Sequence, residues 1–437
     1  MQAGRRMKSS LRSLRGLAIA PWIVLALTGC LGSPSDLEGE GELREPIERP
    51  ADLGAADAAC GTFPADHFRY LDDTRCARRM PSDRSRTWSC PNTATSARTR
   101  PAGGTRDVTY TRDGRPSTVD LETLRPFVPS DVAMSVALIR RVDGEAHVRW
   151  LGTARHAEPI QPWSSTKWLA IAHAAARMRT LSGYRIGLDA AVSGIPLGDL
   201  ATVVHQYDER RYSSNGLARW FLDIGGRSRA NGLMRTWLGR PARETYGGNY
   251  GAPSAALPYS FSNGAAALDV TPDLGTGPAN QLSTDALADA LRRVVLHREV
   301  LPAERLPGLQ WTDVQHLLYG AERSRWYGPS TPGGMQADTA IYVQQALDLA
   351  ALERRSLGQW RVFGKLGFGP SRGGEFVHVS YGCLPTLDDA GRAIPDRGQE
   401  FVIATQLPAR GDHPGADARM AQIYRAVLGG MLDGRVR

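Results

Sequence analysis

Lysine is almost missing from this chain of 437 residues. Its 53 basic residues include three lysines, Lys8, Lys167 and Lys365, and arginine supplies the rest. Arginine keeps its charge inside proteins, whereas a desolvated lysine can lose a proton and act as a base. A chain that has otherwise replaced lysine by arginine is expected to keep lysine where that chemistry is needed. Composition alone therefore suggests chemical roles for Lys167 and Lys365.

Several motifs of common protein classes are missing as well. The nine histidines are scattered without an H-E-x-x-H pair, and the sequence holds no P-loop and no basic stripe with interleaved aromatics. No histidine lies at ligand spacing from a cysteine, so a zinc site is not expected. The sequence thus predicts no metal, no cofactor and no nucleic-acid partner.

The N-terminal apolar run, residues 16–27, is too short for a confident membrane span and follows five basic residues. It ends in Leu27-Thr28-Gly29-Cys30, which resembles the lipobox of bacterial lipoproteins. The resemblance implies diacylation of Cys30 and a cell-envelope location, at the outer membrane in a Gram-negative host because Leu31 follows. An ordinary secretory segment with a stray cysteine is the alternative. Loss of the five basic residues lowers the formal charge from +8 to +3.

Four cysteines remain after this segment: Cys60, Cys76, Cys90 and Cys383. An even count in an exported chain indicates two disulfides with three possible connectivities, and unpaired buried thiols are the alternative. Because three of the four lie in one short segment, every complete pairing ties one of them to Cys383. Closing so long a loop would contribute roughly 4–5 kcal/mol in the chain-entropy model.

Composition divides the chain into short N-terminal segments and one large domain. We expect a signal peptide at 1–29, a solvated tether at 30–58, a cysteine-containing segment and linker at 59–117, and the main domain at 118–435. Its expected strands are 133–139 and 146–151, joined by the hairpin signal Asp143-Gly144, and 375–381 and 400–407; its expected helices are 164–176, 214–223, 229–238, 283–298 and 416–431. This order predicts an antiparallel sheet with helices on its faces.

Lys167 follows Ser164 by three residues at the start of the helix expected at 164–176. Residues i and i+3 share a helical face, so the hydroxyl and the amine can meet. The helix N-terminus favours the alkoxide that forms on the serine, and the backbone N–H of Ser164 can face a developing oxyanion. The pattern S-x-x-K is weak by itself.

Two further motifs strengthen it. Ser213-Ser214-Asn215 supplies S-x-N and Lys365-Leu366-Gly367 supplies K-x-G, in the order used by the penicillin-recognising serine hydrolases. Residues 212–226 also resemble the class A β-lactamase stretch Y-S-D-N-x-A-x-x-x-L-x-x-I-G-G. The resemblance covers roughly residues 120–432. It implies an α+β, β-lactamase/transpeptidase-like fold, with an antiparallel sheet flanked by helices and an all-helical subdomain.

The resemblance also implies a role for each matched residue. The expected roles are nucleophile for Ser164, general base for Lys167, proton relay for Ser213, a hold on Lys167 and on the substrate amide for Asn215, and positive charge for Lys365. Gly367 is expected to keep the strand edge clear, and the N–H of Phe368 to complete the oxyanion hole.

Two features depart from that family. Leu366 stands where the family has Thr or Ser, so one hydroxyl contact to a substrate carboxylate is missing. Arg372 either compensates by gripping that carboxylate or is an exposed loop charge. No E-x-x-L-N follows the S-x-N, and Glu244 is expected to be a solvated loop residue rather than a general base. The insertion at 301–345, with Trp311, either roofs the site or fills a satellite core, and we expect the second.

The sequence therefore predicts a serine hydrolase that forms an acyl-enzyme on cell-wall peptide or a β-lactam and deacylates slowly. The alternatives are a true class A-type β-lactamase and, in a different class, a non-catalytic wall-binding lipoprotein. The expected partners are a small-molecule or peptidoglycan-peptide substrate and a membrane reached through the lipid anchor.

Overall fold

A computed structural model describes residues 81–437, apart from 84, 87, 113, 115–118, 207–210, 249, 329–330, 338–340, 370–374 and 409–412. The predicted signal peptide and tether lie outside the described residues, as do Cys30, Cys60, Cys76 and Arg372. Within the described ranges, no helix has the length and apolar character needed to cross a bilayer.

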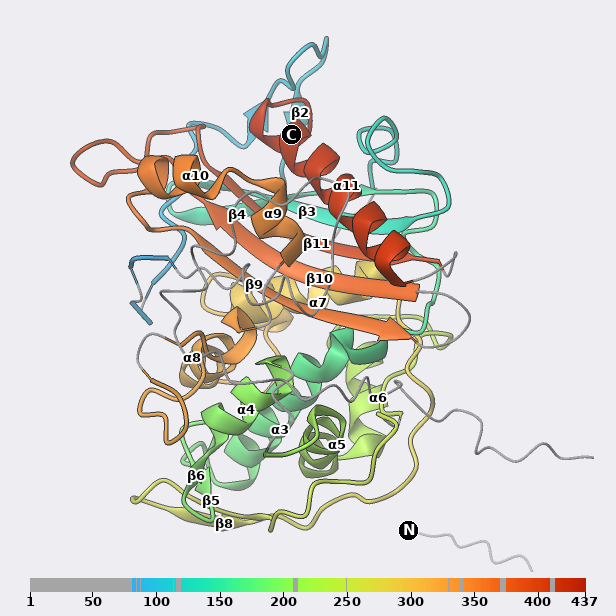
Figure 1. The fold of residues 1–437 in the computed structure, drawn as a ribbon, viewed down its shortest axis with the longest axis vertical. Helices are drawn as coiled ribbons and strands as arrows, with labels where there is room; N and C mark the ends of the chain where they lie inside the picture. Colours follow the sequence, from blue (N-terminus) through green and yellow to red (C-terminus); the bar gives the residue numbers. More distant parts are fainter. Residues whose placement is uncertain are drawn as a thin grey trace, which may run out of the picture. The chain divides into compact units, whose positions relative to one another are not determined.

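A five-stranded antiparallel sheet forms the centre of the described chain (Figure 1). Its strands, in spatial order, are β4 (Glu145–Gly152), β3 (Ala133–Val142), β11 (Gln399–Leu407), β10 (Glu375–Leu384) and β9 (Arg361–Gly369). Asp143 and Gly144 turn the β3–β4 hairpin with φ of 53° and 80°, the positive pair that a type I′ turn requires. The predicted hairpin is confirmed.

Strand β9 was not predicted from the sequence. It contains the K-x-G motif, which precedes the predicted strand observed as β10. The strand is hard to predict because Gly364, Gly367 and Gly369 interrupt its apolar pattern, and glycine weakens a strand signal.

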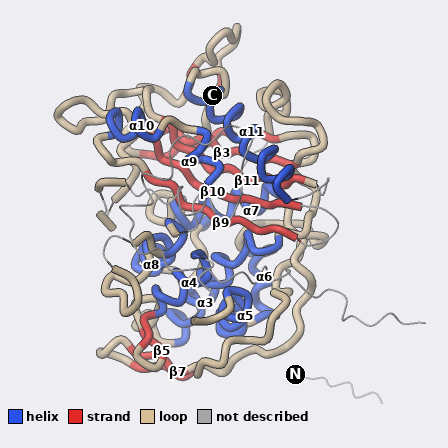
Figure 2. The backbone as a smooth tube through the Cα atoms, viewed as in Figure 1, coloured by secondary structure: helices blue, strands red, loops and turns tan. Residues whose placement is uncertain are grey.

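Helices cover both faces of the sheet (Figures 1 and 2). On one face α11 (His413–Leu432) and α9 (Ile341–Ala346), with α10 (Leu349–Ser356) beside them, cover a core that includes Leu366 and Phe376. On the other face α7 (Thr284–Val295) covers the larger core, which includes Val379. Because side chains alternate along a strand, neighbouring residues of β9 and β10 belong to different cores.

The all-helical part adjoins β9 (Figure 1). It comprises the 3₁₀ turn η2 (Trp163–Thr166), α3 (Lys167–Leu181), α4 (Leu197–Gln206), α5 (Ser214–Gly225), α6 (Arg227–Thr236) and α8 (Trp311–Tyr319). Nearly every side chain of α3 is buried, which explains why its sequence is apolar on all sides. The predicted helices are confirmed with small changes of bounds, whereas α4 and α8 were not predicted.

The remaining elements are short. They are β1 (Arg98–Thr99) paired with β2 (Val108–Thr109), a small sheet of β6 (Ile195–Pro196), β5 (Ala191–Val192), β7 (Ser260–Ser262) and β8 (Ala267–Asp269), and the 3₁₀ turns η3 (Pro302–Glu304) and η4 (Gly334–Gln336). The expectation of a satellite core around Trp311 is wrong. Trp311, Trp326 and Tyr327 pack against the larger core instead.

A disulfide joins Cys90 to Cys383, with Cα atoms 5.8 Å apart. The prediction that Cys383 pairs with one of the three upstream cysteines is confirmed. The bond fixes the N-terminal described segment to β10. Beside it, the Arg141 guanidinium donates two hydrogen bonds of 2.7 Å to the Glu400 carboxylate.

Candidate active site

The turn that carries Ser164 has an unusual backbone. Trp163, the residue before it, has a φ of 48°, which a bulky non-glycine residue rarely adopts. Both the N–H and the Oγ of Ser165 donate to the carbonyl of Pro162, which holds the turn in place. Strained backbone of this kind clusters at functional sites. The strain therefore supports a functional role for the Ser164 turn.

Lys167 begins α3 directly after this turn. Its side chain is fully buried, and Ser164 is 2% exposed. The Nζ of Lys167 donates a 3.1 Å hydrogen bond to Oγ of Ser214, at the first residue of α5. The S-x-x-K segment and the serine-asparagine segment, predicted from sequence as parts of one site, are thus in direct contact.

The two serines at the start of α5 differ in what they contact. Ser213 is the N-cap of the helix, and its Oγ accepts from the N–H of Gly216 at 3.4 Å. It is half-buried, whereas Ser214 is 2% exposed. The neighbouring Asn215 has a buried Oδ1 without a hydrogen-bond partner in the described part of the chain. Ser214 was not singled out from sequence, because the S-x-N pattern selects Ser213.

The middle of β9 closes the site from the sheet side. A Cβ at Gly367 would lie 2.6 Å from the backbone nitrogens of both Ser164 and Ser165, so only glycine fits there. Lys365, two residues earlier, shares that face of the strand and is fully buried. Its Nζ donates to the carbonyl of Leu366 at 3.1 Å. The absence of a side chain at Gly367 thus lets β9 pack closely against the Ser164 turn.

Leu366 faces away from this site. It pairs with His378 across β10, and its side chain lies in the core under α11. Phe368 is half-buried and packs with Phe376 against the same core. The missing hydroxyl at Leu366 therefore has a structural reason, because the side chain fills a core position.

Glu244 corrects a second expectation, because it is fully buried rather than solvated. Its Oε1 accepts two hydrogen bonds from Arg240, at 2.9 and 2.6 Å. Its Oε2 accepts from both the N–H and the Oγ of Ser283, the N-cap of α7, at 3.1 Å each. Arg240 is four residues away in the chain, whereas Ser283 is 39 residues away, and no sequence motif indicates that contact. Glu244 thus closes the base of the loop that runs between α6 and α7.

Two tyrosines of that loop lie close to the Ser164 turn. The hydroxyl of Tyr250 lies 3.1 Å from Oγ1 of Thr166 and 3.5 Å from the hydroxyl of Tyr246. Burial raises the pKa of Tyr246 well above its usual value. Both tyrosines are buried. Sequence patterns did not identify them, because no motif marks a loop tyrosine.

Glu375, at the start of β10, is another carboxylate close to this turn. Its Oε2 accepts from the indole N–H of Trp163 at 3.0 Å, and its Oε1 accepts from Gln406 at 2.9 Å. The Trp163 ring also occupies the space beside Gly369. One oxygen of Glu375 thus holds Trp163 in place, and the other is bonded to Gln406.

His205 of α4 reports the charge of the site. Burial lowers its pKa to about 3, with the nearby Lys365 and Lys167 as further causes. Its Nδ1 lies 2.7 Å from the carbonyl of Ala201. Two fully buried lysines thus lie near this histidine. A negative charge that develops on a substrate would be stabilised there.

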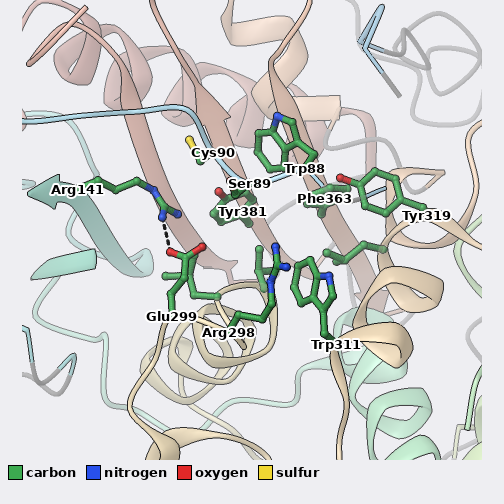
Figure 3. A pocket seen from close by; sticks show the side chains of 13 residues that line it. Trp88, Ser89, Cys90, Arg141, Arg298, Glu299, Trp311, Tyr319, Phe363 and Tyr381 are labelled. Atoms are coloured by element: carbon green, nitrogen blue, oxygen red, sulfur yellow. Dashed lines mark hydrogen bonds and ion pairs between the residues drawn. The ribbon is translucent and has the colours of Figure 1, made fainter. Parts of the chain in front are cut away.

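The measured cavities lie elsewhere. One of about 20 Å³ lies beside the disulfide between Trp88, Trp311 and Phe363, next to the ion pair of Arg141 and Glu299 (Figure 3). Its volume suits a single water molecule and excludes a peptide or a lactam. A second, of about 320 Å³, lies among α4, α8 and the segment 321–336. Neither is lined by the predicted catalytic residues. In the described part of the chain, no cluster of three or more metal-binding side chains occurs.

Comparison with known proteins gives structural likeness only. Neither a protein-family model nor a curated protein matches the sequence. Among solved structures, a β-lactamase from Burkholderia vietnamiensis is 14% identical with a TM-score of 0.38, over 70% of this chain and 93% of its own. A β-lactamase from Xanthomonas campestris pv. campestris is 15% identical with a TM-score of 0.37, over 70% and 93%.

The C-terminal domain of the Bacillus licheniformis BlaR penicillin-receptor is 11% identical with a TM-score of 0.34, over 72% of this chain and 97% of its own. At these identities and TM-scores, the likenesses assign neither an activity nor a substrate to this chain.

Proposed function

We propose that this chain is a penicillin-recognising serine hydrolase that forms an acyl-enzyme through Ser164 on an amide or lactam substrate. The observation that carries the proposal is the meeting of three distant segments. The Ser164 turn and Lys167, the serine pair at the start of α5, and the Lys365–Gly367 part of β9 pack together. Residues of these kinds in contact have no simple structural purpose, because burying two lysines is costly.

The arrangement supports a defined first step. Lys167 takes the proton of the Ser164 hydroxyl while its oxygen attacks the substrate carbonyl carbon. The N–H of Ser164 and the positive charge of Lys365 stabilise the negative charge that develops. The serine pair next to Lys167 returns the proton to the leaving nitrogen. The product is an ester of Ser164 and a released amine, or a ring-opened lactam.

Slow deacylation is part of the proposal. Hydrolysis of the ester needs an activated water, and general-base help contributes ~10²–10⁴-fold to such a step. Glu244, in the loop between α6 and α7, and Glu375, which contacts Trp163 of the turn, each have both oxygens in hydrogen bonds. With neither carboxylate available as a base, an acyl-enzyme formed with a β-lactam is expected to accumulate.

A fluorescent penicillin tests acylation directly. The wild-type protein should acquire a covalent label that survives denaturation on a gel. Ser164→Ala and Lys167→Arg should both abolish it, because arginine keeps the charge of lysine and cannot act as a base. Ser228 is an exposed serine of α6 whose hydroxyl donates to Asp273. The variant Ser228→Ala is the matched control and should label normally.

Each other result has a meaning. Labelling that persists in Lys167→Arg would show that the base is another residue. No labelling of the wild type would favour a non-catalytic binding protein. Rapid steady-state hydrolysis of a chromogenic cephalosporin would identify a true β-lactamase instead.

The location is part of the same proposal. We infer from the lipobox-like segment that Cys30 is lipidated and that the protein is anchored in a cell envelope. Cys30→Ser should move the protein from the membrane fraction to the soluble fraction. Membrane retention of that variant would contradict the anchor.

A further inference from the structure

The larger of the two cavities lies among α4, α8 and the segment 321–336. The two helices lie side by side (Figure 1). The cavity volume of about 320 Å³ is at the lower end of the ~300–1,000 Å³ typical of small-molecule sites. Polar and charged residues supply most of its lining. The cavity therefore has the size and the character of a site for a small polar molecule.

Helix α4 holds the wall of this cavity in a fixed shape. A Cβ at Gly198 would lie 2.4 Å from the backbone nitrogen of Ala321, so the segment packs directly on the helix. The Oγ1 of Thr202 accepts from the N–H of Gly334 at 2.9 Å, and the side chain of Gln206 donates to a carbonyl of the same segment at 2.9 Å. Residues four apart share a helical face, so one face of α4 carries all three contacts.

Asp199, in the first turn of α4, lines this cavity and is fully buried. Its Oδ2 accepts from the N–H of Arg325 at 2.7 Å, whereas its Oδ1 has no hydrogen bond within the described chain. Burial raises the pKa of Asp199, and the nearby Ser324 hydroxyl and Trp326 N–H oppose that rise only in part. Neutral groups alone thus hold this carboxylate in place.

No cation of the described chain forms an ion pair with Asp199. The guanidinium of Arg211 lowers the pKa of Asp199 from a distance, but it lies over the Trp326 ring, 4.6 Å from its centroid. Arg86 also lines the cavity, and the nearby Glu322 already balances its charge. A buried carboxylate without a positive partner is costly. The cavity therefore favours a positively charged ligand.

We propose that this cavity binds a small organic amine that also carries hydroxyl groups, with its ammonium group paired to Asp199. An ammonium brings three hydrogen-bond donors of its own. A metal ion is a poorer match, because no three metal-binding side chains gather among the described residues. Thr331 and Gln336 of the lining offer a hydroxyl and an amide to the ligand hydroxyls, and Tyr319 offers an aromatic ring. This site goes beyond the proposed hydrolysis, since it shares no residue with the three catalytic motifs.

Two sugars of nearly the same shape test the charge. Glucosamine carries an ammonium group where glucose carries a hydroxyl. Titration calorimetry on the full-length protein should give an affinity for glucosamine ~10–100-fold higher than for glucose, the range expected of a hydrogen bond to a charged group. Asp199→Asn should lose this difference. Asp107→Asn, at an exposed carboxylate paired with Arg100, is the matched control and should keep it.

A second variant fills the cavity without touching Asp199. Thr331→Arg adds bulk and a like charge at a half-buried lining residue, and glucosamine binding should be lost. Thr236→Arg, at an exposed residue of α6, should bind normally. Circular dichroism checks that each variant is folded. If Asp199→Asn does not fold, the two sugars and Thr331→Arg still decide the matter.

Three results would overturn the proposal. Equal affinities for glucosamine and glucose would mean that Asp199 does not select a charge. Glucosamine binding that survives in a folded Asp199→Asn or in Thr331→Arg would place the ligand elsewhere. A wild-type protein that does not bind glucosamine would rule out a site for hydroxylated amines. None of these results bears on penicillin labelling through Ser164.

Discussion

The two faces of the central sheet differ sharply in what they bury. Toward α3 and α7, the sheet carries Lys365 and the ion pair of Arg141 with Glu400, all fully or nearly fully buried. Toward α11 it carries mainly apolar side chains, such as Leu366 and Phe376. Polar side chains there include His378, whose Nδ1 lies 2.8 Å from the hydroxyl of Tyr424, and Thr405, whose Oγ1 donates to that hydroxyl at 3.4 Å.

The difference shows that the side chains of the candidate site and those of the apolar core under α11 lie on opposite faces of the sheet. Lys365 and Leu366 are neighbours in the chain, yet the strand alternation sends them to opposite faces. Lys365 reaches the face that meets the Ser164 turn, and Leu366 reaches a core that touches no predicted catalytic residue. One strand thus places one set of side chains at the candidate site and holds the sheet to α11 with the other.

Substitutions at this pair should produce the largest contrast. Lys365→Met removes a buried positive charge near the developing oxyanion, and penicillin labelling should slow by about 10²–10³-fold. Leu366→Thr introduces the residue that the resembled family uses. It should leave the labelling rate within a few fold and lower the free energy of unfolding by about 2–4 kcal/mol, because it removes buried methyl groups and buries a hydroxyl.

Labelling kinetics and urea unfolding measured on both variants check this contrast. Labelling of Leu366→Thr must be measured at a temperature where circular dichroism shows it folded. Faster labelling, or tighter binding of a substrate carboxylate by this variant, would mean that residue 366 reaches the substrate after all.

Glu244 offers the next largest effect, on stability alone. Glu244→Gln removes the charge that pairs with Arg240 and bonds Ser283 at the α7 cap. Breaking a buried pair in this way is expected to cost about 3–5 kcal/mol in urea unfolding. Glu158→Gln breaks the exposed pair with Arg155 and should cost less than about 1 kcal/mol.

The deacylation rate decides what Glu244 does. Loss of label from the acyl-enzyme, followed after removal of free penicillin, should proceed at the same rate in Glu244→Gln and in the wild type. A variant that unfolds normally but deacylates ~10²-fold more slowly would make Glu244 the general base.

Much of the scaffold could be predicted from the sequence because its signals are local. A few consecutive residues are enough to predict the Asp143-Gly144 turn, the apolar helix α3 and the helix that begins at Ser283. β9 was not predicted because its glycines interrupt the apolar pattern of the strand. One of them, Gly367, lies where a Cβ would collide with the backbone of Ser164 and Ser165. Close packing at the candidate site thus weakened the sequence signal of the strand.

The candidate site could be predicted as far as its motifs reach. Ser164, Lys167 and Lys365 meet the expected segments because the order and spacing of the motifs constrain them. The contact of Lys167 with Ser214, the burial of Glu244 and the approach of Tyr250 could not be predicted. Each depends on how a loop packs against a helix end, and no spacing in the sequence encodes that distance.

Acid should produce the smallest effect on the free energy of unfolding. It acts on one histidine of the sheet and on one of the helical part. Burial lowers the pKa of His378 to about 3 on one face, with Lys365 as a second cause, and that of His205 to about 3 in the helical part. An imidazole with a lowered pKa contributes stability that is fully present above its unfolded value of 6.5 and is lost as the pH falls through the folded value. Each should therefore cost about 1.4 kcal/mol at one pH unit below the unfolded pKa.

Urea unfolding from about pH 7 to pH 5 measures the slope. His378→Gln cannot bind that proton, so its stability should fall less steeply with acid than that of the wild type. Parallel curves for the two proteins would show that folding does not change the pKa of His378 and would contradict the lowering by burial.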